Sequence, residues 1–432
     1  EVKFYFVKLD FASQNKEDYM KKALSILLAM GMTVGMVAGC GDTADNSSAA
    51  ASTEAGTDGT QAAASAADIK VGVIYIGDEN EGYTAAHMAG IDEMAANLGL
   101  SDDQIIEKTT IPEDEKAYDA AVDLAEQGCD IIFATSFGHE TYILQAAQEY
   151  PDIQFCHATG FKAAGSGLAN MHNYFDAIYE ARYVSGVVAG MKLNEMIENG
   201  TITADQAKIG YVGAYPYAEV ISGFTSFYLG AKSVCESVTM EVQYTNSWAD
   251  MSGEAEVAAK LIDDGCVLIS QHADTTGAPS TCEDKKVPCV GYNVDMTTVA
   301  PDAALTSPTN NWGVYYTHAV QCVLDGTAIE TDWCQGFAEG AVDITPINEA
   351  VAAEGTDAKV EEVEAALKDG SLHVFDTSTF TVNGSSLEDL IAEGGDYAKY
   401  ADYVSDGYYH ESELASAPSF DIIIDGITSV TN

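Results

Sequence analysis

The feature that most constrains the fold of this chain is a strand–helix unit that occurs twice. The run Lys70–Ile74 (KVGVI) recurs 138 positions later as Lys208–Val212 (KIGYV). The run from Leu124 to Ile132 recurs 137 positions later, from Leu261 to Ile269, and each copy contains a Gly-Cys step. Because the two spacings agree to within one residue, they predict two similar structural units in one chain.

Short apolar strands alternate with helical stretches in both copies. In the first copy the pattern predicts strands at 69–76, 129–134 and 152–157 and helices at 84–98, 118–127 and 140–150. In the second copy it predicts strands at 208–212, 242–244, after Cys266 and at 288–292, with a helix at 223–234. Such alternation is typical of an α/β fold, here two doubly wound parallel-sheet lobes joined by a hinge. Ligands bind such sheets beyond the carboxyl ends of the strands, so facing lobes would share one cleft.

The loops after the predicted strands supply the candidate ligand-binding residues. They are Tyr83, Phe137, Gly138, Tyr217, Asn246, Trp248, His272, Asp274, Asn293 and Asp295. Flat aromatic faces beside amides and carboxylates suit a planar heterocycle that is stacked and hydrogen-bonded at its edge. Other interpretations stay open: a loop aromatic can cover the core, His272 can be a buried structural histidine, and Asp274 or Asp295 can cap a helix.

The charge of the chain limits what it can bind. There are 68 acidic residues against 19 Lys and Arg, a formal net charge of −49, and Arg182 is the only arginine. A nucleic-acid partner is excluded because no basic face can be built, and phosphorylated ligands are disfavoured because they call for arginine. We therefore expect a neutral or cationic small ligand.

Motifs for catalysis, metal or cofactor binding are absent from the sequence. It contains no GxSxG, HExxH or GxxxxGK[ST], and its nine cysteines include no CxxC pair. We expect no catalytic residue, no cofactor and no metal. Cys282 could bridge to Cys289, and Cys322 to Cys334, or all could be buried free thiols.

The N-terminal residues have the pattern of an export signal. We interpret residues 1–19 as a spurious extension, 20–39 as a lipoprotein signal peptide, Cys40 as the lipidated residue and 40–67 as a flexible tether. An ordinary signal peptide or a short membrane helix are the alternatives. We expect a two-lobed module over 68–370, with lobes of about 68–175 and 205–300 plus later crossing segments, and an extension over 371–432 that wraps the lobes.

Seven segments of the chain form a distinctive set: 137–139 (FGH), 157–160 (HATG), 174–190 (YFDAIYEARYVSGVVAG), 210–223 (GYVGAYPYAEVISG), 245–248 (TNSW), 271–272 (QH) and 312–316 (WGVYY). Together they resemble the basic membrane protein family of lipoproteins, which are substrate-binding components of ABC importers for nucleosides and purines. The resemblance implies a type I periplasmic-binding-protein fold and a monomer anchored outside the cytoplasm by lipid alone. It also implies a purine base or nucleoside as ligand, and ABC permease and ATPase subunits as partners.

The resemblance also implies roles for individual residues. Phe137 matches a loop aromatic that stacks on the base, and 291–295 (GYNVD) matches a segment whose acidic residues hold ligand, with Asn293 in place of the first. The chain has 81–84 (EGYT) where nucleoside-binding relatives have Ser-Phe-Asn-Gln, and Asn310 lies near a family lysine that contacts the sugar. These changes favour a free purine base. The alternatives are a ligand-sensing surface lipoprotein on the same fold and a nucleoside hydrolase using Asp274 and Asp295.

Overall fold

The computed structural model describes residues 67–430, all within one compact unit that spans Gly59–Asn432. The expectations for residues 1–66, including the signal peptide, Cys40 and nearly all of the tether, lie outside the described residues. Within residues 67–430, no helix is both long and apolar enough to cross a bilayer.

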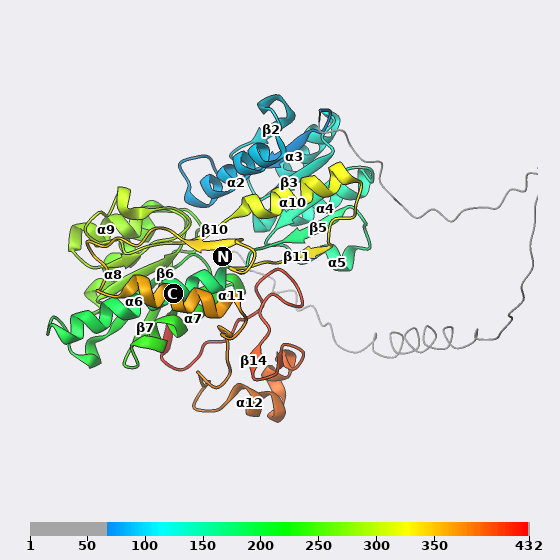
Figure 1. The fold of residues 1–432 in the computed structure, drawn as a ribbon. Coiled ribbons are helices and arrows are strands. Elements are labelled where there is room, and N and C mark those ends of the chain that lie inside the picture. Colours follow the sequence, from blue (N-terminus) through cyan, green and yellow to red (C-terminus); the bar gives the residue numbers. More distant parts are fainter. Residues whose placement is uncertain (1–66, 431–432) are drawn as a thin grey trace, which may run out of the picture. The chain divides into compact units, whose positions relative to one another are not determined.

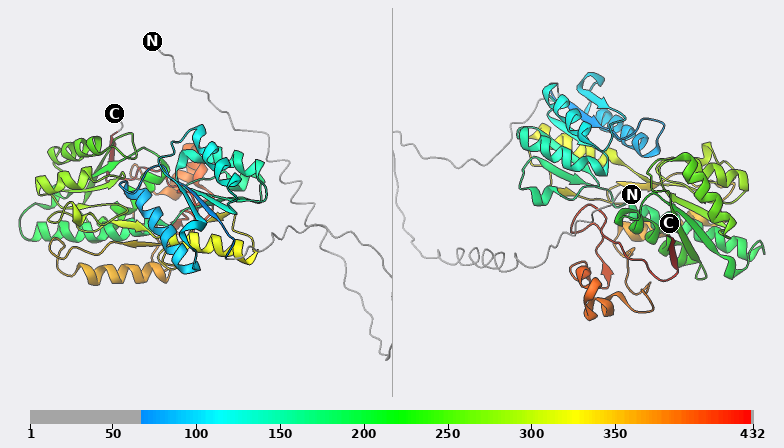
Figure 2. Two further views of the ribbon diagram at one scale, coloured as in Figure 1. Left: turned by 90° about the horizontal axis from the view of Figure 1, so that it is seen from above. Right: turned by 180° about the vertical axis from the view of Figure 1, so that it is seen from behind.

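The first lobe is built on a six-stranded parallel sheet with the strand order β11-β5-β4-β3-β1-β2. Its strands are β1 (Val71–Ile74), β2 (Ile105–Lys108), β3 (Ile131–Ala134), β4 (Gln154–Ala158), β5 (Met171–Tyr174) and β11 (Asp332–Trp333). Its helices are α2 (Gly82–Leu98), α3 (Glu115–Glu126), α4 (Glu140–Glu149), α5 (Ala163–Ser166) and α10 (Trp312–Asp325), with short 3₁₀ turns η1 (Asp102–Gln104) and η2 (Phe137–His139). Figures 1 and 2 show helices on both faces of this sheet.

The second lobe repeats this plan with a five-stranded parallel sheet in the order β15-β7-β6-β8-β9. Its strands are β6 (Lys208–Gly213), β7 (Thr239–Tyr244), β8 (Leu268–His272), β9 (Cys289–Val290) and β15 (Ile427–Val430). Its helices are α6 (Ile178–Glu198), α7 (Ala218–Val234), α8 (Met251–Asp263) and α9 (Gly277–Lys285), with 3₁₀ turns η3 (Ala204–Gln206) and η4 (Met296–Thr298). The two parallel sheets confirm the predicted α/β two-lobe fold.

Side chains that alternate along each strand divide the core into two layers. In β1, Val71 and Val73 join one hydrophobic cluster, whereas Ile74 joins a second cluster with Leu124 of α3 and Ile143 of α4. This division follows from the two-residue period of a strand, which points successive side chains to opposite faces. The strands are apolar on both faces because helices cover both, as parallel sheets require.

The internal repeat is visible in the packing of two equivalent glycines. A Cβ on Gly72 of β1 would contact Leu124 and Cys129, at 3.0 and 3.1 Å. A Cβ on Gly210 of β6 would contact Leu261 and Cys266, at 2.9 and 3.1 Å, which are the corresponding residues of the second copy. Each sheet thus needs a glycine where the C-terminal turn of a helix packs on an interior strand, and this shared need explains the matching sequence motif.

The lobes are joined by three connections rather than one. The chain passes from β5 in the first sheet to α6 beside the second, returns to the first lobe in α10, and crosses again between β11 and β12 (Val342–Ile344). β12 pairs antiparallel with β10 (Pro308–Asn310) at these crossings. We expect any relative motion of the lobes to be a hinge bending at these crossing segments.

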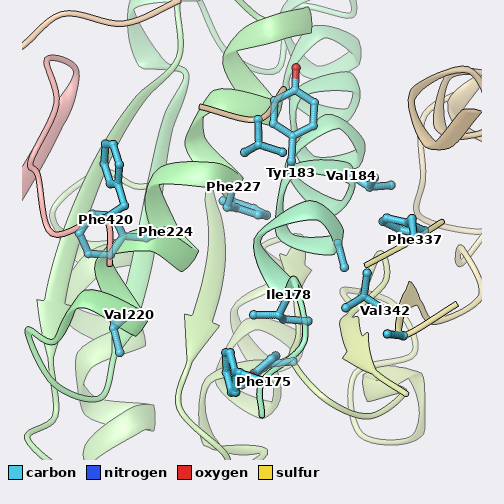
Figure 3. Packing of buried hydrophobic residues seen from close by; sticks show 14 of the residues in the cluster. Phe175, Ile178, Tyr183, Val184, Val220, Phe224, Phe227, Phe337, Val342 and Phe420 are labelled. Atoms are coloured by element: carbon cyan, nitrogen blue, oxygen red, sulfur yellow. The ribbon is translucent and has the colours of Figure 1, made fainter. Parts of the chain in front are cut away.

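The C-terminal segment contributes a strand as well as a cover. Its elements are α11 (Thr356–Lys368), α12 (Leu387–Glu393), η5 (Gly395–Tyr400), the hairpin β13 (Val404–Ser405) and β14 (Tyr408–Tyr409), and β15. β15 pairs with β7 at the edge of the second sheet, and Ser416 donates its backbone N–H to Asp332 of the first sheet. Figure 3 shows Phe420 of this segment in one hydrophobic cluster with Val184 of α6 and Phe227 of α7.

All eight cysteines from Cys129 to Cys334 are free thiols, and all but Cys334 are buried. Of the two possibilities left open by the sequence, the structure therefore has the small buried hydrophobes.

Candidate ligand-binding cleft

A cleft opens where the strand ends of the two lobes face each other, with about 620 Å³ of empty space when the open solvent at its mouth is included. Its lining residues are Ile76, Gly77, Glu81, Tyr83, Thr135, Ser136, Phe137 and Thr159 of the first lobe, and Glu219, Trp248, Ala249, His272, Asp274 and Tyr292 of the second. In both lobes these residues follow or lie at the carboxyl ends of strands. This is the position at which doubly wound sheets bind ligands.

Aromatic rings from both lobes surround the mouth of the cleft. Phe137 of the first lobe has 41% of its surface exposed, and its ring centroid lies 6.0 Å from that of Tyr217 in the second lobe. Tyr217 stacks on Tyr215 at 5.0 Å, and Tyr215 meets the Trp248 ring edge-on at 5.3 Å. Because Phe137 has few neighbours, much of its face is available for a bound ring.

The loop that carries Phe137 is fixed from behind by one carboxylate. Glu113 Oε1 accepts hydrogen bonds from Ser136 Oγ and from the Gly138 backbone N–H, both at 2.7 Å. A Cβ on Gly138 would come within 2.6 Å of the Glu113 side chain, so only glycine fits here without displacing that carboxylate. Gly138 thus positions the aromatic residue rather than lining the cleft itself.

The deep end of the cleft is closed by a contact between the lobes at Asp274. The Gly82 backbone N–H, at the start of α2, donates to the Asp274 carbonyl oxygen at 3.2 Å. The Asp274 carboxyl group accepts from Asn293 Nδ2 at 3.3 Å, and Asn310 Nδ2 donates to Asn293 Oδ1 at 3.3 Å. Burial raises the pKa of Asp274 well above its usual range, and the carboxylates of Glu81, Glu254 and Glu219 raise it further.

A second acidic group, Glu219, lies beside a buried imidazole in the same cleft. Glu219 Oε1 is 3.5 Å from Nε2 of His272, whose two ring nitrogens have no hydrogen-bond partner. Burial raises the pKa of Glu219 to about 7, and burial together with the Arg182 charge lowers the pKa of His272 well below its usual range. His272 is therefore neutral near pH 7, and its contact with Glu219 is not an ion pair.

Several groups in the cleft lack a hydrogen-bond partner. Buried atoms of this kind are Thr159 Oγ1, Tyr292 Oη and both ring nitrogens of His272. A buried polar atom without a partner costs about 1–3 kcal/mol, which a ligand that supplies the missing hydrogen bond would recover. The cleft is thus equipped with hydrogen-bonding groups as well as aromatic faces.

The structure brings five of the predicted residues to the cleft, namely Tyr83, Phe137, Trp248, His272 and Asp274. Tyr83 is buried, donates its hydroxyl to the Thr135 carbonyl oxygen and has its ring edge-on to His87. Tyr217 lies at the mouth and is 46% exposed. Asn293 supports Asp274, and Asn310 supports Asn293, so both act behind the lining residues.

Two further predicted residues, Asp295 and Asn246, neither line the cleft nor support a residue that does. Asp295 is exposed and caps η4, where its carboxylate accepts from the Thr297 backbone N–H at 2.8 Å. This is the capping role that the sequence had left open. Asn246 is exposed and takes a positive φ of 59° in the turn after β7. The short side chain of asparagine tolerates this left-handed conformation, so its position in the turn explains its presence.

Glu219, Thr159 and Tyr292 are among the lining residues that sequence reasoning missed. Glu219 begins α7, Thr159 follows β4 and Tyr292 follows β9. Thr159 has a positive φ of 64°, which holds its loop in an uncommon conformation at the strand end. The strand-end rule would have found Thr159 and Tyr292 if every polar residue after a strand had been included. Within residues 67–430, no group of three or more potential ligands is arranged to hold a metal ion.

The two parallel sheets and the cleft between them define a two-lobe periplasmic-binding-protein fold. A solute-binding protein of an ABC transporter from Aeropyrum pernix matches with a TM-score of 0.58 and 17% identity, over 75% of this chain and 96% of that one. Another from Conexibacter woesei has a TM-score of 0.56 and 21% identity, over 71% and 98%. At this level of identity the likeness establishes the fold.

Comparison of sequences shows the family. Residues 69–371 match the Bmp family model, described as ABC transporter substrate-binding protein PnrA-like, and the chain belongs to this family. A purine-binding protein of Brucella abortus is 36% identical over 311 residues, 71% of this chain and 83% of that protein. A protein of Haloferax volcanii, provisionally named an ABC transporter glucose-binding protein, is 32% identical over 269 residues, 62% and 64% of the two chains. The family consists of non-enzymatic substrate-binding proteins, which confirms that the chain is not an enzyme.

Proposed function

We propose that this protein captures a free purine base in the cleft between its lobes and delivers it to an ABC permease. In this proposal Phe137 stacks on the ring, Trp248 and Tyr217 close over it from the second lobe, and Asp274 and Glu219 bind its edge. Cys40 would carry the lipid that holds the protein at the outer face of the cell membrane, and 40–67 would be the tether.

The observation that carries the proposal is the pairing of an open aromatic face with buried polar atoms in one cleft. Phe137 is 41% exposed, whereas the polar groups of Thr159, His272 and Tyr292 are buried and lack partners. A purine has two flat faces that suit stacking and an edge of alternating donors and acceptors. The name of the Brucella relative, a purine-binding protein, points to the same ligand class.

A base is favoured over a nucleoside because the groups near the expected ribose position are already engaged. Glu81 caps α2 by accepting from the backbone N–H groups of Tyr83 and Thr84, at 2.7 and 2.9 Å. Asn310 donates to Asn293 and lies behind the lining residues. Neither side chain is therefore free to bind sugar hydroxyls without breaking an existing hydrogen bond.

Isothermal titration calorimetry with adenine, guanine, hypoxanthine, xanthine, inosine, ribose and glucose tests the proposal. We expect 1:1 binding of at least one free base, at least tenfold tighter than inosine, and no binding of ribose or glucose. Tight binding of glucose alone would replace the proposal with a sugar-binding function. Incubation with inosine, followed by chromatography for hypoxanthine, tests the hydrolase alternative, and we expect no release.

A further inference from the structure

Arg182 is a fully buried cation that forms no ion pair with any residue from 67 to 430. Its Nη1 donates to Tyr211 Oη at 2.8 Å and to the Gln271 carbonyl oxygen at 2.7 Å, while Nε and Nη2 have no partner. The guanidinium carbon lies 3.8 Å from the centre of the Tyr292 ring. Among residues 67–430, no carboxylate oxygen lies within 4.0 Å of this guanidinium. Since Tyr292 lines the cleft, the charge lies directly behind the cleft wall.

A buried guanidinium stays protonated and is costly unless a negative charge compensates it. The carboxyl groups that interact electrostatically with Arg182 are those of Glu219 and Asp274, and both line the cleft. Together with Glu81, which acts electrostatically on Asp274, three carboxyl groups line the cleft. Like charges so close together cannot all ionise, so a division into charged and neutral carboxyl groups follows.

The contacts of each carboxyl group indicate which one is ionised. Asp274 has three other acidic groups around it, Glu81, Glu219 and Glu254, which disfavour its charged form. Asn293 Nδ2 donates to Asp274 Oδ1 only, so Oδ2 is available to carry a proton. Glu219 keeps 15% of its side-chain surface exposed, and the charge of Arg182 favours its ionised form. Glu219 is therefore the better site for the negative charge.

This inference rests on the proposed function and assigns the chemistry of the same cleft. We propose that Arg182 is the internal counter-ion of the cleft, which keeps Glu219 ionised as a hydrogen-bond acceptor while Asp274 stays protonated as a donor. The cleft then selects a neutral heterocycle that offers a ring N–H to Glu219 and a lone pair to Asp274. A cationic ligand, which the acidic composition alone would allow, is disfavoured because Arg182 already balances the charge.

The assignment predicts how binding depends on pH. The titratable and charged groups around Glu219 and Asp274 are Arg182 of α6, His272 at the end of β8, Tyr292 after β9, Glu254 of α8, and Glu81 and Tyr83 at the start of α2. Burial keeps His272 and both tyrosines neutral from pH 5.5 to 8.5, because it lowers the pKa of the imidazole and raises those of the phenols. Binding should weaken as pH falls below about 7, where Glu219 becomes protonated.

Calorimetric titration of the purine base that binds the wild-type protein, repeated from pH 5.5 to 8.5, tests this proposal. Arg182→Met removes the charge, and Arg182→Lys keeps it. We expect Arg182→Met to bind about tenfold more weakly at pH 7 and to recover to within about threefold at pH 8.5, because loss of the cation raises the pKa of Glu219 by about one unit or more. Arg182→Lys should follow the wild-type pH profile. An Arg182→Met profile that superimposes on the wild-type one would overturn the proposal.

Three further variants decide the question even where Arg182→Met does not fold. Glu219→Gln should abolish the weakening of base binding at acid pH. Glu254 is the control, because it is a buried carboxyl group outside the cleft whose pKa is also raised to about 7. Glu254→Gln should still bind the base more weakly at acid pH, as the wild-type protein does. Asp274→Asn should bind within about threefold of wild type at pH 7, because the amide still donates. A hundredfold loss in Asp274→Asn would show that Asp274 binds as a carboxylate and would overturn the assignment.

Failure of the charge assignment is distinguishable from failure of the proposed function. If the wild-type protein binds a purine base and the variants deviate as described, only the charge assignment is wrong. If it binds none of the four bases, both the proposed function and this inference are overturned.

Discussion

Replacing Phe137 with alanine should separate ligand binding from folding. The Phe137 side chain is 41% exposed, and its nearest aromatic neighbours, Tyr217 and Phe161, have ring centroids 6.0 and 6.3 Å away. Truncation therefore removes little buried contact and should cost about 1 kcal/mol of folding free energy or less. For a protein of this size that corresponds to a fall in Tm of about 2 °C.

The same change should have a large effect on binding. Stacking of a base on an aromatic side chain contributes about 1–3 kcal/mol, which corresponds to a loss in affinity of about five- to 150-fold. We expect Phe137→Ala to weaken purine binding by about tenfold or more in calorimetric titration, with the stoichiometry unchanged.

Phe161→Ala is the matched control. Phe161 is the same residue type, is 55% exposed and is not a lining residue of the cleft. It should bind the base as the wild-type protein does. Wild-type affinity in Phe137→Ala, or an equal loss in both variants, would refute the stacking role.

Three further changes test the fold around the cleft. Gly186→Ala should lower the free energy of unfolding by about 3 kcal/mol in a denaturant titration, because its Cβ would lie 2.0 Å from the Phe227 carbonyl oxygen and force α6 and α7 apart. Gly165→Ala is the control: its Cβ would have no atom within 4 Å, so we expect no destabilisation. Ending the chain after Gly426 removes β15 and exposes the edge of β7. We expect a lower Tm in calorimetry and self-association of the truncated protein in light scattering. An unchanged Tm would show that β15 adds no stability. The carboxyl group of Asp176 is buried without a partner, and burial raises its pKa well above its usual range. The protonated Asp176 therefore contributes to the free energy of unfolding in acid, and this contribution is lost as pH rises above about 4. We expect Asp176→Asn to gain free energy of unfolding relative to the wild-type protein between pH 4 and 7. Parallel curves of stability against pH for the two proteins would contradict this.

The fold could be predicted from the sequence because its constraints are local and repeated. Gly72 and Gly210 lie on interior strands of their sheets, and a Cβ at either would meet the equivalent Leu and Cys side chains of its own copy. Because both sites need a glycine opposite a leucine and a cysteine, the same pattern of residues occurs twice in the sequence. The crossing segments were harder to place, because α10 and β11 follow the second lobe in sequence but join the first, and β15 completes the second sheet from the far end of the chain.

The cleft could be predicted in part, and the remainder depends on tertiary packing. Phe137, Trp248 and Asp274 follow strands directly, so the strand-end rule finds them. Asp295 obeys the same rule but caps η4, because its carboxylate reaches the nearby Thr297 backbone N–H instead. Arg182 lies within α6 behind the second sheet, and no local pattern indicates that its charge faces the cleft through Tyr292.

The central claim is that this cleft holds a flat purine ring between the two lobes. A crystal structure of the protein grown with the base that binds most tightly in calorimetry tests it most directly. We predict that the ring stacks on Phe137, with its edge within hydrogen-bond distance of Asp274 and Glu219. A ring bound elsewhere, or one in this cleft that leaves Phe137 and both carboxyl groups without contact, would contradict the account.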